Sequence, residues 1–179
     1  MTIPNIVGSS VAYQGRVITV RIDDLVESKE RKYKREVAVV PDSVAVVVLD
    51  EQGRVLLIRQ YRHPMKEFMW EIPAGRLDVQ GEPSLDAALR ELAEEVDLKA
   101  SSAEELATFG NSIGWTTEMT TVYLVREFAK TDTFARRNEE ASIEARWLPL
   151  AEAIEEIGSH EIRDAKTIIG LLLTSSRVG

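Results

Sequence analysis

The chain contains no cysteine, which excludes disulfide bonds and thiolate metal sites. It also has no run close to the ~18 uninterrupted apolar residues that a membrane-spanning helix requires. The first ten residues, MTIPNIVGSS, have no basic stretch followed by an apolar one, so we expect no signal peptide. These absences predict a cytoplasmic protein that does not contact membranes.

Positive charge is scarce as well. The chain has 22 Lys and Arg residues against 30 Asp and Glu residues, which gives a formal net charge of −8 at pH 7. This balance argues against a nucleic-acid-binding surface. A protein of this charge that binds an anionic substrate must do so locally, through a metal ion or a few arginines.

The chain does have enough apolar material for a core, since 44% of its 179 residues are apolar. Alternating apolar residues predict strands, and apolar residues at helical spacing predict helices. We expect two strands in 11–25 around a Gln14-Gly15 turn, a hairpin in 43–62, and further strands in 68–75, 105–111, 118–128 and 142–150. We expect helices in 82–98, 149–158 and 161–175. This order predicts an α+β fold, with 1–40 as a small N-terminal β extension that pairs with another chain and 41–179 as the main domain.

The segment 82–98, EPSLDAALRELAEEVDL, carries a cluster of acids. On a helical wheel its apolar residues form one core-facing stripe, made of Leu85, Ala88, Leu89, Leu92 and Val96. Glu91, Glu94 and Glu95 fall on the opposite side, where each like-charge pair one turn apart costs roughly 0.2–0.5 kcal/mol. So small a cost is compatible with a solvated acidic face, and Ser84 is expected to cap the helix. The alternative is a divalent cation such as Mg²⁺ above this turn, because Mg²⁺ prefers oxygen ligands.

Together with the residues before it, this segment resembles the signature of the Nudix hydrolase family. That signature is Gly, five residues, Glu, seven residues, then Arg-Glu-apolar-any-Glu-Glu-any-Gly-apolar. Here Gly75 opens the pattern, Glu82 follows, and RELAEEVDL supplies its end. The loop between Gly75 and Glu82 is one residue longer than the pattern, and Asp97 replaces the final Gly. RQYRHPMKEFMWEIPAG and EIRDAKTIIGLLL resemble the ADP-ribose pyrophosphatase branch of this family.

The resemblance implies a Nudix α/β/α sandwich with a mixed sheet, in a homodimer. It implies a Mg²⁺-dependent pyrophosphohydrolase of nucleoside diphosphate sugars, with Mn²⁺ as an alternative ion. ADP-ribose, cleaved to AMP and ribose 5-phosphate, is the first substrate expected. GDP- or UDP-sugars are an alternative, because Ile113 in SIGWTTE replaces a Pro that the branch associates with ADP-ribose. Two further alternatives are a non-catalytic Nudix-fold ligand-binding regulator, which the complete set of signature acids disfavours, and an acidic interaction domain without a metal.

The same resemblance assigns the metal ligands. Glu91, Glu94, Glu95 and the carbonyl oxygen of Ala74 are expected to bind Mg²⁺. Arg90 is expected to orient the carboxylates. Glu94 and Arg90 are therefore counted among the catalytic residues as well.

Hydrolysis also requires an acid that takes the proton from the attacking water. In the branch that this chain resembles, a loop before a Trp-x-Pro strand supplies it. Here the loop is ARRNEEASIEARW, so Glu139 or Glu140 is the candidate, and Glu144 is an alternative.

The resemblance finally assigns four residues to substrate binding. Arg62 is expected to contact the phosphates, because a planar guanidinium suits phosphate oxygens, and Arg76 is expected to bind substrate as well. Glu71 is expected to bond a ribose hydroxyl. Tyr33 is expected to stack on the base, with Tyr13 as the alternative aromatic.

Overall fold

The structure is a computed structural model that describes residues 2–29, 31–131 and 143–178. The chain divides into two compact units. The N-terminal unit comprises Met1–Asp42 and Gly110–Met119, and the second unit comprises Ser43–Phe109 and Thr120–Gly179. The domain boundary after residue 40 stays a prediction, and the observed N-terminal unit also includes a segment from the middle of the chain.

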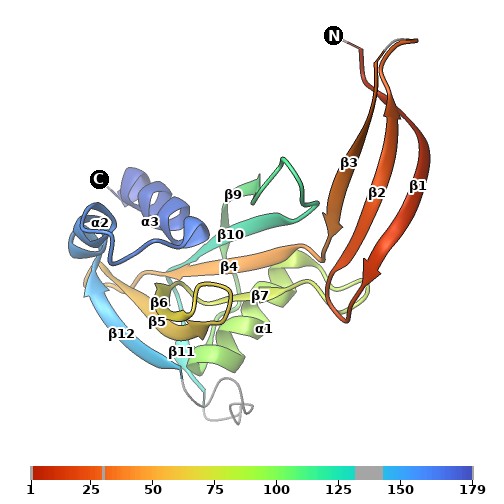
Figure 1. Ribbon diagram of the computed structural model, residues 1–179. Helices are drawn as coiled ribbons and strands as arrows, with labels where there is room; N and C mark the ends of the chain where they lie inside the picture. The colour runs from red at the N-terminus through yellow and green to blue at the C-terminus, as the bar shows by residue number, and fades with distance from the viewer. Residues whose placement is uncertain (1, 30, 132–142, 179) are drawn as a thin grey trace. The chain divides into compact units, whose positions relative to one another are not determined.

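The described residues of the N-terminal unit contain the strands β1 (Asn5–Gln14), β2 (Thr19–Val26) and β3 (Lys32–Val39). These form an antiparallel sheet in the order β1-β2-β3 (Figure 1). The predicted turn is confirmed, since the Gly15 N–H donates to the Ile18 carbonyl at 2.8 Å. The segment 110–119 joins the end of β3, where the Ala38 N–H donates to the Trp115 carbonyl at 2.7 Å.

The described part of the second unit holds one mixed sheet, one antiparallel sheet and a short antiparallel strand pair. Its strands are β4 (Ser43–Val48), β5 (Arg54–Arg62), β6 (Glu67–Glu71), β7 (Ala74–Arg76), β8 (Leu98–Lys99), β9 (Glu104–Gly110), β10 (Met119–Val125), β11 (Ala129–Lys130) and β12 (Glu144–Pro149). One sheet has the order β7-β4-β10-β9, a second has the order β12-β5-β6, and β8 pairs with β11. β4 runs parallel to β10 and antiparallel to β7, so the first sheet is mixed as expected.

The hairpin predicted over 43–62 is wrong. β4 and β5 follow one another along the chain but belong to different sheets, joined by a bridge between Leu49 and Val55. Both strands contain runs of fully or almost fully buried residues, at 44–48 and 55–58. Strands buried on both faces need a packed layer on each side. Apolar periodicity therefore identified the two strands correctly but could not identify their partners.

Helices cover both faces of these sheets (Figure 1). They are α1 (Ser84–Val96), α2 (Leu150–Gly158) and α3 (Ala165–Val178). Alternate residues of β4 belong to two separate cores: Val46 lies in the cluster with Leu92 of α1, and Val47 lies in the cluster with Leu171 of α3. This layering confirms the expected α/β/α sandwich. None of the described helices has the length and apolar character needed to cross a membrane, and the cytoplasmic location stays a prediction.

Two helix starts differ from the prediction. The helix expected from residue 161 begins at Ala165, because the Asp164 carboxylate accepts hydrogen bonds from the N–H and the hydroxyl of Thr167, at 3.0 and 2.6 Å. Ser84 does not cap α1 with its side chain. Its hydroxyl instead shares a 2.7 Å hydrogen bond with the Tyr123 hydroxyl, which ties the start of α1 to the sheet.

Candidate active site

The candidate site lies where β7 meets the acidic helix α1. Gly75, in the middle of β7, lies so close to Glu91 that a Cβ atom added to it would be 2.0 Å from the carboxyl carbon of Glu91. Only glycine permits this approach of a side chain to the backbone. The first residue of the sequence pattern therefore makes room for a carboxylate near the end of the pattern.

Glu95 is a buried acid, with 7% of its surface exposed. Its carboxylate accepts a hydrogen bond from the Ala74 N–H at 3.0 Å. Burial is the largest cause that raises the pKa of Glu95, to about 8, and Glu91 adds to it, while the Ala74 N–H, Arg62 and Lys166 act in the opposite direction. The prediction that Glu95 faces away from the core is wrong: Glu95 follows Ala88 by seven residues and therefore lies beside the apolar stripe, on the side of α1 that the start of β7 covers. Without a positive partner, a carboxyl in this position favours its protonated form.

Arg90 brings the acids of the pattern together. Its Nε and NH2 atoms donate to the two carboxylate oxygens of Glu82, each at 3.0 Å, and its NH1 atom donates to Glu91 at 2.7 Å. Glu94 lies 3.6 Å from the same NH1 atom. The hydrogen bonds from Arg90 lower the pKa of Glu82. The loop with its extra residue therefore still brings Glu82 to the helix.

The pKa of Glu91 is raised, like that of Glu95. Burial raises the pKa of Glu91, Arg90 lowers it, and the charges of Glu94 and Asp78 raise it again, so the net shift is upward. Two neighbouring, desolvated carboxyl groups with raised pKa values are an arrangement that a cation would relieve.

The donor chemistry fits a hard divalent cation. Mg²⁺ is usually held by one or two carboxylates together with water and substrate phosphates, and Glu91 and Glu95 supply two such carboxylates. As the side chains lie, no three Asp, Glu or His residues of the described chain converge closely enough to hold a metal ion. Arg90 stands beside Glu91, at hydrogen-bonding distance. The metal-binding roles of Glu94 and of the Ala74 carbonyl stay predictions.

A second group of charges lies at the end of β6. Glu71 is only 1% exposed, and the Nε and NH2 atoms of Arg62 donate to its two oxygens, each at 2.6 Å. The ammonium group of Lys166 donates to the same carboxylate at 2.6 Å. Both oxygens of Glu71 are therefore engaged by cations of the protein. This pairing competes with the predicted bond to a ribose hydroxyl and makes Glu71 a support for Arg62.

The other predicted substrate residues come from both units. Arg76 is exposed at the end of β7. Tyr33 lies on β3 of the N-terminal unit, where the guanidinium carbon of Arg35 is 4.5 Å from the centre of its ring. Tyr13, the alternative aromatic, is exposed at the end of β1. The roles of these residues stay predictions.

The proton acceptor also stays a prediction. Glu139 and Glu140 lie outside the described residues. Glu144, the alternative, is exposed on β12, where one of its oxygens is 3.6 Å from the NH1 atom of Arg59.

Sequence reasoning missed Lys166 as a residue of the site. A signal was present in DAKT, because Asp164 and Thr167 have the spacing of a capped helix start, which puts Lys166 in the first turn of α3. Nothing in that motif identifies the partner, since Glu71 is 95 positions away along the chain.

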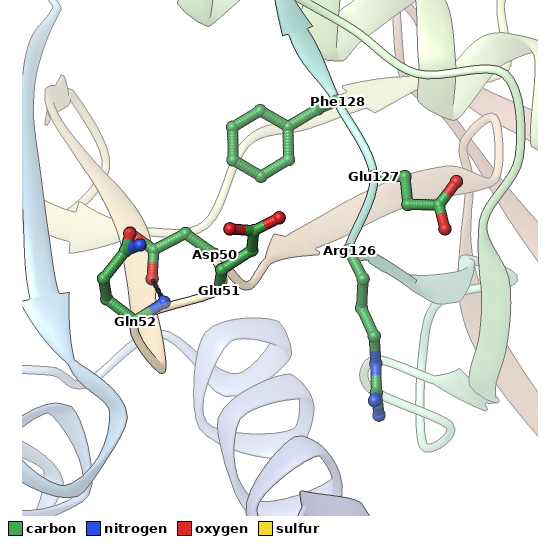
Figure 2. Close-up of a pocket in the computed structure, with 6 residues that line it drawn as sticks. All are labelled: Asp50, Glu51, Gln52, Arg126, Glu127 and Phe128. Carbon is green, nitrogen blue, oxygen red and sulfur yellow. Dashed lines mark hydrogen bonds between the residues drawn. The ribbon is translucent and has the colours of Figure 1, made fainter.

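A cavity of about 360 Å³ lies elsewhere on the second unit (Figure 2). It is lined by Asp50, Glu51, Gln52, Arg126, Glu127 and Phe128. None of these is a predicted site residue, and the Asp50 carboxylate already accepts hydrogen bonds from the backbone and guanidinium of Arg54, each at 2.8 Å. We therefore place the chemistry at the acidic helix and not in this cavity.

Comparisons with known proteins place this geometry in context. The model of the NUDIX domain family matches residues 39–169. The chain is 34% identical over 166 residues to an ADP-ribose pyrophosphatase of Mycobacterium tuberculosis, and this alignment covers 93% of this chain and 80% of that protein. It is 32% identical over 159 residues to a methanol dehydrogenase activator of Bacillus methanolicus, covering 89% of this chain and 85% of that protein. A solved structure of an ADP compounds hydrolase superimposes with a TM-score of 0.85 at 20% identity, covering 98% and 94% of the two chains, and so shares the fold.

Proposed function

The chain belongs to the Nudix family of hydrolases, which act on pyrophosphate bonds, and from this premise we propose that it hydrolyses ADP-ribose to AMP and ribose 5-phosphate with a bound Mg²⁺ or Mn²⁺ ion. The observation that carries the proposal is the pair of acids at β7: half-buried Glu91 against Gly75 and buried Glu95 on the Ala74 N–H. Their raised pKa values favour a cation between the protein and an anionic substrate.

Each part of the chain has a distinct role in this proposal. The metal ion, when bound to Glu91 and Glu95, supplies charge that polarises the phosphoryl oxygens and lowers the pKa of a bound water. Arg90 orients the acids through its bonds to Glu82 and Glu91. Arg62, held by Glu71, presents its guanidinium to the phosphates.

The proton of the attacking water goes to a carboxylate near the reacting phosphate. Glu139 or Glu140 is proposed for this role, and Glu144 is the alternative. Glu144 has its closest described cation, Arg59, at 3.6 Å, so its carboxylate is not locked in a short ion pair.

Two observations favour alternatives to ADP-ribose. Ile113 is 87% exposed and replaces the Pro of the branch, so the fixed φ angle that a Pro would give this loop is missing. The absence of this Pro supports hydrolysis of GDP- or UDP-sugars by the same site. The relative from Bacillus methanolicus is named as an activator, which keeps the ligand-binding regulator as a second alternative.

A panel of ADP-ribose, a GDP-sugar and a UDP-sugar, assayed with and without Mg²⁺, tests the proposal. We expect hydrolysis only with the cation, with AMP and ribose 5-phosphate as the products from ADP-ribose. We also expect the GDP- and UDP-sugars to be cleaved at rates near that of ADP-ribose, because Ile113 replaces the Pro that the branch associates with ADP-ribose. Binding of ADP-ribose without turnover would favour the regulator, and a strong preference for ADP-ribose would show that the missing Pro is unimportant.

We also propose that the protein is a homodimer that pairs through the N-terminal unit. β1 is an edge strand of its sheet, and an edge strand presents unpaired backbone groups to a second chain. Apolar side chains on and before this strand are exposed, namely Ile3, Ile6, Val7, Val11 and Tyr13. Exposed apolar side chains along the edge strand of a sheet favour association with a second chain.

Replacing Val7 and Val11 together by Lys is expected to halve the mass in solution, because two ammonium groups on β1 oppose burial against a second copy. Light scattering after size-exclusion chromatography measures the mass. Leu172→Lys is the control, since Leu172 is 48% exposed on α3, and it should leave the mass unchanged. A Val7, Val11 double variant with the mass of the wild type would exclude β1 from the interface.

A further inference from the structure

Arg62 and Lys166 share one buried carboxylate. Oε2 of Glu71 accepts hydrogen bonds from Arg62 and from Lys166, each at 2.6 Å, and Oε1 accepts from the Nε atom of Arg62 at 2.6 Å. Lys166 also donates to Asp164 at 2.8 Å. The four side chains therefore form a row of alternating charge. Arg62 is its exposed end, with 39% of its side chain accessible, against 2% for Glu71 and 16% for Lys166.

The inner end of this row is fixed to the backbone. Asp164 accepts hydrogen bonds from the N–H and the hydroxyl of Thr167, at 3.0 and 2.6 Å. The hydroxyl of Thr167 in turn accepts from the N–H of Ile72 at 2.9 Å. Because Ile72 directly follows Glu71, the first turn of α3 and the end of β6 are joined into one hydrogen-bonded unit.

We propose that Lys166 is a positioning residue for the diphosphate of the substrate and that it acts through Glu71 on Arg62. The inference rests on the proposed function, in which Arg62 contacts the phosphates. A buried carboxylate that faced Arg62 alone would offset most of the guanidinium charge. Lys166 binds the same oxygen of Glu71 and also pairs with Asp164. Without the charge of Lys166, Arg62 would be the only cation beside two carboxylates, and the row would carry a net negative charge that opposes an anion.

Lys166→Met tests this role, because Met keeps an unbranched apolar stem and removes the charge. With ADP-ribose and Mg²⁺, we expect KM to rise about tenfold, since a charge-assisted bond to phosphate is weakened, while kcat stays within about twofold of the wild type. A thermal melt establishes that the variant is folded. If it is not, Lys166→Gln, which also removes the charge, replaces it with the same expectation.

A double-substitution cycle shows whether Lys166 acts through Arg62. In an Arg62→Met background, adding Lys166→Met is expected to change KM by less than about twofold, because residues that act through one another are not additive. The matched control is Arg163→Met, since Arg163 also links the segment before α3 to β6, through Glu67 at 2.6 Å, without touching Glu71. It should leave KM unchanged. A second tenfold rise in the Arg62→Met background would overturn the inference.

The same four proteins of the cycle are then compared for their affinity for inorganic pyrophosphate, measured by calorimetry without any divalent cation. This measurement does not depend on turnover. If no substrate is hydrolysed but pyrophosphate affinity follows the cycle, the proposed function fails and the role of Lys166 stands. If ADP-ribose is hydrolysed but Lys166→Met leaves KM unchanged, the role of Lys166 is overturned and the function stands. If the wild type binds no pyrophosphate without the cation, the KM cycle alone decides the role of Lys166.

Discussion

Glu95→Gln is expected to lower kcat for ADP-ribose by roughly 10³-fold, because a metal ion supplies several kcal/mol of transition-state stabilisation and each ~1.4 kcal/mol is tenfold in rate. Gln has the shape of Glu but no charge, so it removes one of the two carboxylates that lie together at β7. A steady-state assay at saturating Mg²⁺ measures the loss. Glu152→Gln, on the exposed first turn of α2, is the control and should keep full activity.

The fold of the Glu95→Gln variant is expected to be at least as stable as that of the wild type when no metal is present. Burial and the neighbouring Glu91 raise the pKa of Glu95 to about 8. A group whose folded pKa is raised opposes folding once the pH exceeds its unfolded pKa. At neutral pH the amide therefore replaces a carboxyl that already favours its uncharged form, and it can still accept the Ala74 hydrogen bond. Full activity in this variant would remove Glu95 from the metal site, and a large fall in the melting temperature would give it a structural role.

The features that depend on residues close together along the chain could be predicted from the sequence. The acidic helix and its apolar stripe belong to one segment, in which a few residues set the geometry. Most of the longer strands were also predicted, because alternation in burial is a local pattern, whereas β3 lies largely in SKERKYKRE, a charged segment compatible with either a connection or an exposed strand. Their pairing was not: β4 and β5 read as a hairpin, yet each is buried on both faces and takes its main partners from other parts of the chain.

The burial of Glu95 and the role of Lys166 differ in whether the sequence could predict them. Glu95 follows Ala88 by seven residues, so a helical wheel drawn at ~100° per residue places it beside the apolar stripe of α1, on the side that β7 covers, and its burial was open to prediction. Lys166 reads as a solvated residue in the first turn of a helix. It becomes part of the site only because α3 packs beside the end of β6 and brings its ammonium group to Glu71. The contact of Lys166 with Glu71 depends on elements that meet after the chain has folded, and no local periodicity identifies it.

Gly75→Ala is expected to lower kcat by about 100-fold, on the same scale of tenfold per ~1.4 kcal/mol, while leaving the fold nearly intact. The new methyl carbon would lie 2.0 Å from Cδ, 2.3 Å from Cγ and 2.3 Å from Oε1 of Glu91, which is closer than any real contact. All three atoms belong to the outer part of a flexible side chain. Glu91 therefore rotates away, leaves its 2.7 Å bond to Arg90 and takes one metal ligand out of the site.

Two measurements separate this displacement from general damage. The melting temperature of Gly75→Ala should change by no more than about 2–4 °C, the shift expected for ~1 kcal/mol in a chain of this size. In a Glu91→Gln background, adding Gly75→Ala should lower kcat by less than about threefold, because both substitutions remove the same ligand. Gly158→Ala is the control, since nothing lies within 4 Å of its added carbon. If Gly75→Ala keeps the kcat of the wild type, then the carboxylate of Glu91 is not needed where the structure places it, and the metal site must be built from other acids of α1.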